Sequence, residues 1–197
     1  MIPNSHIVVY PIPTPDGELK VGERLVNYVC YRNVAEGSEL DELMTGTDGV
    51  RRSVSLPPGL AKQHAVEEMH AATESLAPQL AETVLSAPDP FVQVIVNIKS
   101  TSMASDRVAL LGDGAFSARP HAAAGTAKAA EDGWKLVEAL QSHDSVDDAL
   151  SAWEQTQLQL GQVLVDRCRQ MGERSQFLNT WTAGDPSLAF GLYSAGD

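Results

Sequence analysis

The residues best suited to chemistry lie in one segment, residues 107–132. The segment opens on a short apolar run that predicts a buried strand, and Gly112, Asp113 and Gly114 follow at once. A carboxylate at the end of a strand is fixed in place and can accept hydrogen bonds from sugar-like hydroxyl groups. The two glycines allow a ligand to approach the backbone closely. The sequence therefore predicts a hydroxyl-binding position at Asp113.

A loop with Pro120 and His121 then enters a helix of small residues that begins near Gly125. The first amides of a helix have no acceptor within the helix and lie at the positive end of its dipole. Such an end stabilises an anionic oxygen or nitrogen of a ligand. The segment is interpreted equally well as a plain strand–loop–helix connection, with the aspartate as a cap and the small residues serving packing.

The elements that must position this segment are strands first and helices last. We expect an antiparallel hairpin of residues 7–13 with 24–34, a third strand over 50–56, and two helical stretches over 60–76 and 79–85. Two further strands over 91–98 and 108–111 and a helix over 122–140 are expected to follow. This order favours an α+β fold with an antiparallel sheet over a doubly wound sheet, because alternating βαβ units are missing.

A long amphipathic helix is expected to close the fold. Ser145, with Asp148 three residues on, predicts its start. Less polar residues then recur at steps of three and four: Leu150, Trp153, Gln157, Leu160, Leu164, Cys168 and Met171. We interpret this stripe as core or as a contact between domains.

Composition bounds the function. The chain has 197 residues, a net charge of −12, 43% hydrophobic and 20% charged residues, which suits one domain or one and a half and argues against disorder. The acidic balance argues against a nucleic-acid partner, and no apolar run approaches the ~18 residues of a membrane span. Two distant cysteines and an N-terminus without a signal-peptide pattern predict a cytoplasmic protein.

Other candidate residues are few. The five histidines have no metal-ligand spacing, so no metal site is predicted, and only His121 is placed near a substrate. Tyr10, on a strand that ends in prolines, either lines a substrate pocket or packs within the sheet. Hydrolase, metalloprotease and P-loop motifs are absent, and the sequence identifies no catalytic residue.

The 112–132 segment resembles the second FAD-contacting motif of the class A flavoprotein aromatic hydroxylases, which are single-component FAD monooxygenases. Gly112, Asp113, Pro120, Gly125 and Asp132 follow the family's pattern, while Gly114 replaces an alanine and Phe116 a histidine. The stretches 8–13, 23–34, 57–60, 118–132 and 184–193 resemble the 2,6-dihydroxypyridine 3-monooxygenase branch. As a set, they cover essentially the whole chain.

The resemblance implies a role for each matching residue. Asp113, with Gly112 beside it, would bind the ribityl hydroxyls of FAD, and the amides near Thr126 and Ala127, after Gly125, would hold the pyrimidine edge of the flavin. Pro120 would lie near the reactive edge of the ring. Residues 1–100 would form a substrate-binding sheet, 101–175 the C-terminal part of an FAD-binding domain, and 176–197 a tail.

The family also uses an N-terminal βαβ unit with Gly-x-Gly-x-x-Gly, and the 197 residues contain no such spacing. We therefore expect the C-terminal half of a hydroxylase that uses NAD(P)H and O₂ on an aromatic substrate, with weak or absent FAD binding by the chain alone. The alternative is an inactive remnant or interaction module. It would dimerise through the Leu150–Leu164 part of the stripe or complement a separate FAD-binding half.

Overall fold

The computed structural model describes residues 4–182, 184–186 and 189–193, and the chain divides into two compact units, Met1–Val94 and Ile95–Asp197. Each is described by itself. The sequence placed a boundary between residues 100 and 101, six residues later than this division. The chain contains helices and small antiparallel sheets, in agreement with the predicted α+β class.

A hairpin of two long strands forms the centre of the first unit. Strands β1 (Ser5–Ile12) and β2 (Leu25–Arg32) pair antiparallel, with Val8 opposite Val29. The expected long connection turns at Gly17, whose φ of 83° suits glycine. At one end, the rings of His6 and Tyr31 pack edge to face with centroids 5.2 Å apart. The predicted hairpin is confirmed.

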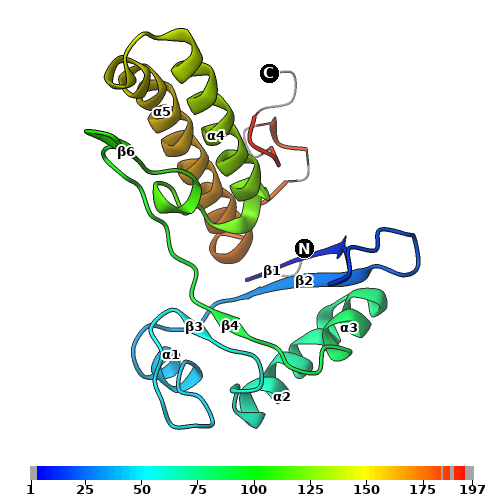
Figure 1. Ribbon diagram of the computed structural model, residues 1–197. Helices are drawn as coiled ribbons and strands as arrows, with labels where there is room; N and C mark the ends of the chain where they lie inside the picture. Colours follow the sequence, from blue (N-terminus) through cyan, green and yellow to red (C-terminus); the bar gives the residue numbers. More distant parts are fainter. Residues whose placement is uncertain (1–3, 183, 187–188, 194–197) are drawn as a thin grey trace. The chain divides into compact units, whose positions relative to one another are not determined.

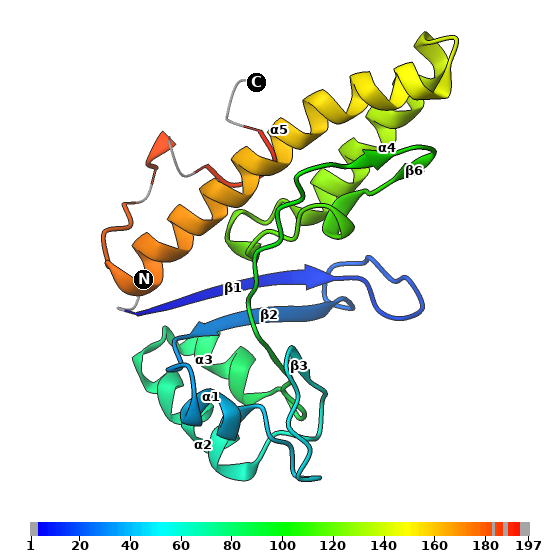
Figure 2. The ribbon, with the colours of Figure 1, turned by 90° about the vertical axis from the view of Figure 1, so that its left-hand side faces the viewer.

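Three helices complete this unit: α1 (Ser38–Leu43), α2 (Gln63–Ala72) and α3 (Pro78–Leu85). The helix predicted over residues 60–76 is shorter, because Lys62 is extended and the end tightens into the 3₁₀ turn η1 (Thr73–Ser75). Pro78 occupies the first turn of α3, where a missing N–H removes no hydrogen bond. Helix α3 packs next to β2, on the same side of the hairpin as α2 (Figures 1 and 2).

Two predicted strands are largely wrong. Of residues 50–56 and 91–98, only β3 (Ser55–Leu56) and β4 (Val92–Gln93) pair as strands. The amides of Ile98 and Ser100 instead donate to the carbonyls of Ser117 and Ala115, at 2.9 and 3.0 Å. An apolar, β-branched run predicts extended backbone, but a strand also needs a neighbour to bond, which the run itself does not specify.

The second unit opens with a tight hairpin, β5 (Ala104–Ser105) and β6 (Val108–Ala109). Two 3₁₀ turns, η2 (Gly112–Gly114) and η3 (Pro120–Ala122), lead to the helices α4 (Gly125–Ser142) and α5 (Val146–Gly172), and a π-helical turn, η4 (Glu173–Phe177), follows α5. Helices α4 and α5 lie side by side (Figures 1 and 2). Ser145 accepts a hydrogen bond from the Asp148 amide at 3.1 Å, so the predicted cap is confirmed.

The apolar stripe of α5 lies inside its own unit. Leu150 and Trp153 pack with Met103, Phe116 and other residues in one core cluster, while Leu164 joins a second with Cys168 and Met171. The exposed fractions of Leu150, Trp153 and Leu164 are 6%, 2% and 1%. Leu150, Trp153 and Leu164 are therefore core residues, and dimerisation of the chain through this stripe stays a prediction.

Among the described residues, no helix combines the length and the apolar character needed to cross a membrane, and no three side chains of His, Cys, Asp or Glu gather as metal ligands would.

Candidate functional site at the start of helix α4

The turn that carries Asp113 is set by Gly112. Gly112 has a left-handed φ of 54°, and a Cβ there would lie 2.9 Å from the Cβ of Ala129 on α4. Its amide donates to Asp132 Oδ2 at 2.9 Å. Backbone conformation, close packing and a buried acceptor thus fix the turn against α4, and the first two disfavour a side chain at position 112.

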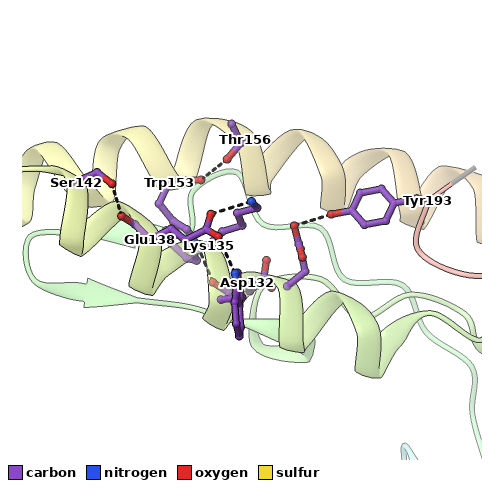
Figure 3. A network of polar contacts seen from close by, with 9 residues as sticks. Asp132, Lys135, Glu138, Ser142, Trp153, Thr156 and Tyr193 are labelled. Atoms are coloured by element: carbon purple, nitrogen blue, oxygen red, sulfur yellow. Dashed lines mark hydrogen bonds and ion pairs between the residues drawn. The ribbon is translucent and has the colours of Figure 1, made fainter. Parts of the chain in front are cut away.

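Asp132, the acceptor, is wholly buried and forms an ion pair with Lys128, whose side chain is 1% exposed. Trp153 of α5 donates its indole N–H to the Asp132 carbonyl at 2.9 Å (Figure 3). The Lys128 ammonium also lies 5.6 Å from the centroid of the Phe116 ring. This pair joins α4, α5 and the Gly112 turn. The resemblance to the family pointed to Asp132, whereas Lys128 was not predicted. A lysine four residues before an aspartate on one helix is nevertheless a visible sign of such a pair.

Phe116, the departure from the family's histidine, is a core residue. Its ring is 2% exposed and packs against α5 at Gly161, where a Cβ would fall 2.3 Å from the ring. Phe116 therefore joins the turn to α5 through its contact with Gly161.

The other predicted cofactor positions lie at the surface. Asp113, Pro120, Gly125, Thr126 and Ala127 are all exposed, whereas Gly112 is buried beneath them. Among the described residues, no atom lies within 4 Å of where a Cβ at Gly114 or Gly125 would stand, and neither glycine has a left-handed φ. The fold of this unit therefore does not require glycine at either position. Gly114 directly follows Asp113, and Gly125 is the first residue of α4.

Helix α4 begins at Gly125, as predicted, and its first turn is uncapped. Ala124 precedes it and forms no side-chain cap. The amides of Gly125, Thr126 and Ala127 have no acceptor within the helix, because the first intrahelical bond here runs from the Lys128 amide to the Ala124 carbonyl at 2.8 Å. Three exposed N–H groups at the positive end of an 18-residue helix form a donor set for an anionic or electron-rich edge.

A single carboxylate fixes the strand that leads into the turn. Glu154 of α5 accepts hydrogen bonds from the Ser102 hydroxyl and from the amides of Met103 and Ala104, at 2.7, 2.5 and 2.9 Å. The Ser102 hydroxyl and these two amides hold the pKa of Glu154 below its usual value. The start of β5 is thereby tied to the long helix.

The two predicted substrate residues lie in different units. Tyr10 stands on β1 with 44% of its surface exposed. His121 is wholly buried on η3, and one ring nitrogen lies 2.7 Å from Gln176 Oε1. Gly172 of α5 packs against this ring, because a Cβ there would be 3.1 Å from it. His121 thus holds the turn that presents Pro120, and its contact with a substrate stays a prediction, as does that of Tyr10.

Comparison with known proteins finds a family model that matches part of the chain. Residues 1–97 match the family described as FAD binding domain-like. The match covers the unit with the β1–β2 hairpin, and the segment from Gly112 to Asp132 lies beyond it.

Two relatives of the same kind match the whole chain. It is 36% identical, over 98% of its length, to the 2,6-dihydroxypyridine 3-monooxygenase of Paenarthrobacter nicotinovorans, of which it covers 48%. The structure of 2,6-dihydroxypyridine-3-hydroxylase from Arthrobacter nicotinovorans matches with a TM-score of 0.86 and 36% identity, again over 98% of this chain and 49% of that one. The chain thus spans about half the length of these relatives, and the predicted resemblance to FAD-dependent aromatic hydroxylases is confirmed.

A more distant structure shares the fold. A salicylate hydroxylase with bound substrate matches with a TM-score of 0.59 and 20% identity, over 93% of this chain and 41% of that one. At that identity, the match speaks for the fold alone.

Proposed function

We propose that the chain forms the flavin-ring and substrate sides of an FAD-dependent monooxygenase that hydroxylates an aromatic or hydroxypyridine-type ring with NAD(P)H and O₂. The observation that carries this proposal is the bare Gly125 at the uncapped start of α4. No atom of the described residues lies within 4 Å of where a Cβ at Gly125 would stand. A planar ligand could therefore approach the backbone there.

The donors and acceptors present fit the flavin half of FAD. The Asp113 carboxylate would accept hydrogen bonds from the ribityl hydroxyls, and the amides of Thr126 and Ala127 would donate to the pyrimidine edge, whose negative charge the helix end stabilises. The diphosphate has no corresponding cradle, because the 197 residues contain no Gly-x-Gly-x-x-Gly. FAD binding by the chain alone is therefore expected to be weak.

FAD, when bound, supplies electron transfer from NAD(P)H and activation of O₂, while the protein orients the rings. The proposed tasks of this chain are accordingly positional. The Gly112 turn holds the Asp113 carboxylate in place, and His121 holds the turn that presents Pro120 towards the ring. Tyr10, on the hairpin of the FAD binding domain-like unit, offers an exposed phenol that could hydrogen-bond a hydroxylated substrate.

We further propose that a polypeptide carrying the missing diphosphate motif completes the site. One exposed face of α4 favours such a partner, because Trp134 and Val137 are 69% and 54% exposed beside an open hollow of about 520 Å³. Isolated apolar side chains are common on surfaces, but these two stand one helical turn apart beside the hollow and so offer a contact to such a partner. In this form, the chain is an interaction module as well as half of an enzyme.

Titration with FAD tests the proposal. The purified chain is expected to change flavin fluorescence only at high micromolar FAD. Co-expression with the part of the Paenarthrobacter relative outside the match is expected to yield a yellow complex with stoichiometric flavin. Absence of flavin from a complex that does form would refute the cofactor assignment, and absence of any complex would refute the module.

A further inference from the structure

The C-terminal segment, predicted as a loop-like tail, is bound closely to the loop in front of α4. The Gly191 amide donates to the Ala122 carbonyl at 2.7 Å. Arg167 of α5 donates through Nη2 to the Gly191 carbonyl and to the Leu192 carbonyl, the latter at 2.9 Å. The Tyr193 hydroxyl donates to Glu131 of α4 at 2.6 Å (Figure 3). Three polar attachments thus join residues 191–193 to α5, to the loop and to α4.

Apolar packing adds to these bonds. Leu192 and Trp181 pack against the second core cluster, which is formed by Ala122, Ala124, Leu164, Cys168 and Met171. Two members of that cluster, Ala122 and Ala124, belong to the loop itself. The segment therefore encloses the loop with side chains as well as with hydrogen bonds.

The enclosed loop contains a strained residue. Ala123 has a φ of 52°, a left-handed conformation that alanine rarely adopts, and its neighbours Ala122 and Ala124 are 0% and 2% exposed. Such a conformation persists only where the surroundings hold it. The chain enters α4 directly after this residue. The direction of the amides at Thr126 and Ala127 thus depends on what holds the loop.

We propose that residues 191–193 form a clasp that holds the first turn of α4 in its anion-binding orientation, and that Arg167 is the positioning residue of this clasp. The clasp acts through the loop 122–124 and does not itself touch the reacting atoms. That the ligand is the negatively charged edge of a flavin rests on the proposed function. The clasp itself rests on the contacts above.

A pair of arginines two residues apart on α5 gives a matched test. Arg167→Met removes both hydrogen bonds from Nη2 to the clasp but keeps most of the apolar stem of the side chain. Arg169→Met removes an exposed arginine that pairs only with Glu173 among the described residues. Arg167→Lys keeps the positive charge on a shorter side chain that can still donate, and Tyr193→Phe removes a single hydroxyl at the far end of the clasp. All four variants are made in the full chain and compared by hydrogen exchange and by FAD titration.

Arg167→Met is expected to speed the exchange of the amides at residues 122–128 and 191–193 roughly tenfold, because a hydrogen bond to a charged group is lost. Its FAD affinity, measured in the flavin-containing complex, is expected to fall by a similar factor. Tyr193→Phe is expected to act in the same direction and more weakly, Arg167→Lys to recover part of the loss, and Arg169→Met to match the parent chain.

Unchanged exchange at residues 122–128 in both Arg167→Met and Tyr193→Phe would overturn the clasp. Faster exchange with unchanged FAD affinity would overturn its positioning role. A parent complex without flavin would instead refute the proposed function, and the exchange data would still decide whether the clasp exists. If Arg167→Met does not fold, as judged by circular dichroism, Tyr193→Phe alone decides between these outcomes.

Discussion

Gly161 and Phe116 are in contact across the core, with no room between them for a further carbon atom. A Cβ at position 161 would stand 2.3 Å from Cδ2 of the ring. We therefore expect Gly161→Ala to destabilise the chain by about 1–3 kcal/mol despite alanine's higher helix propensity, because overpacking outweighs that gain. The measurement is urea unfolding followed by circular dichroism.

Gly133→Ala is the control for that prediction. Gly133 also lies within a helix, but a Cβ there would meet only Leu111 Cδ2, at 4.0 Å. Alanine is expected to stabilise α4 by ~0.5–1 kcal/mol. Equal effects of the two substitutions would show that the contact with Phe116 does not determine the residue at 161.

The buried pair of Lys128 and Asp132 is expected to behave as one unit. Lys128→Met leaves an unpaired buried carboxylate and should cost ~3–5 kcal/mol, and Asp132→Asn leaves an unpaired ammonium with a similar cost. The double variant should lose far less than the sum, since no charge remains buried. Additive losses in a double-mutant cycle of unfolding free energies would contradict this coupling.

The bare glycines separate ligand binding from stability. Gly125→Ala and Gly114→Ala should leave the melting temperature unchanged or raised, because no atom of the described residues lies within 4 Å of the added carbon. In the flavin-containing complex, Gly125→Ala should weaken FAD binding by roughly 10–100-fold, as the methyl group occupies ligand space. Gly114→Ala is the control, because it restores the alanine of the family's pattern and should leave FAD binding unchanged. Gly112→Ala is the contrasting variant, since its left-handed φ and its contact with Ala129 predict a loss of stability. Undiminished FAD affinity in Gly125→Ala would remove the main support for the proposed site.

Acid is expected to weaken the attachment of β5 through Glu154. The pKa of this carboxyl in the folded chain is below its usual value. The stability that Glu154 contributes is therefore complete above the usual pKa and is lost as pH falls through the pKa of the folded chain. Unfolding free energies measured below about pH 5 should therefore fall less steeply for Glu154→Gln than for the parent. Glu74→Gln, an exposed glutamate in the other unit, should follow the parent curve.

The features that were predicted correctly from the sequence involve residues that lie close together along the chain. The Ser145 cap and the stripe of α5 repeat within one helix, so spacing alone reveals them. Residues 91–98 show the limit of this reasoning, because their pairing depends on distant strands and only two of them pair. Phe116 shows another limit, since its packing on Gly161 joins positions 45 residues apart. The clasp of residues 191–193 was missed for the same reason, because three of its four acceptors are backbone carbonyls, which leave no pattern in the sequence.

The open space over Gly125 also bears on how the sequence evolves. If the stability of this unit were the only selected property, alanine would be favoured over glycine in the first turn of α4. We therefore expect glycine at this position to be kept by whatever occupies the space. Related sequences that have lost the ligand should drift to larger residues there, while position 112, which the fold itself constrains, should remain glycine.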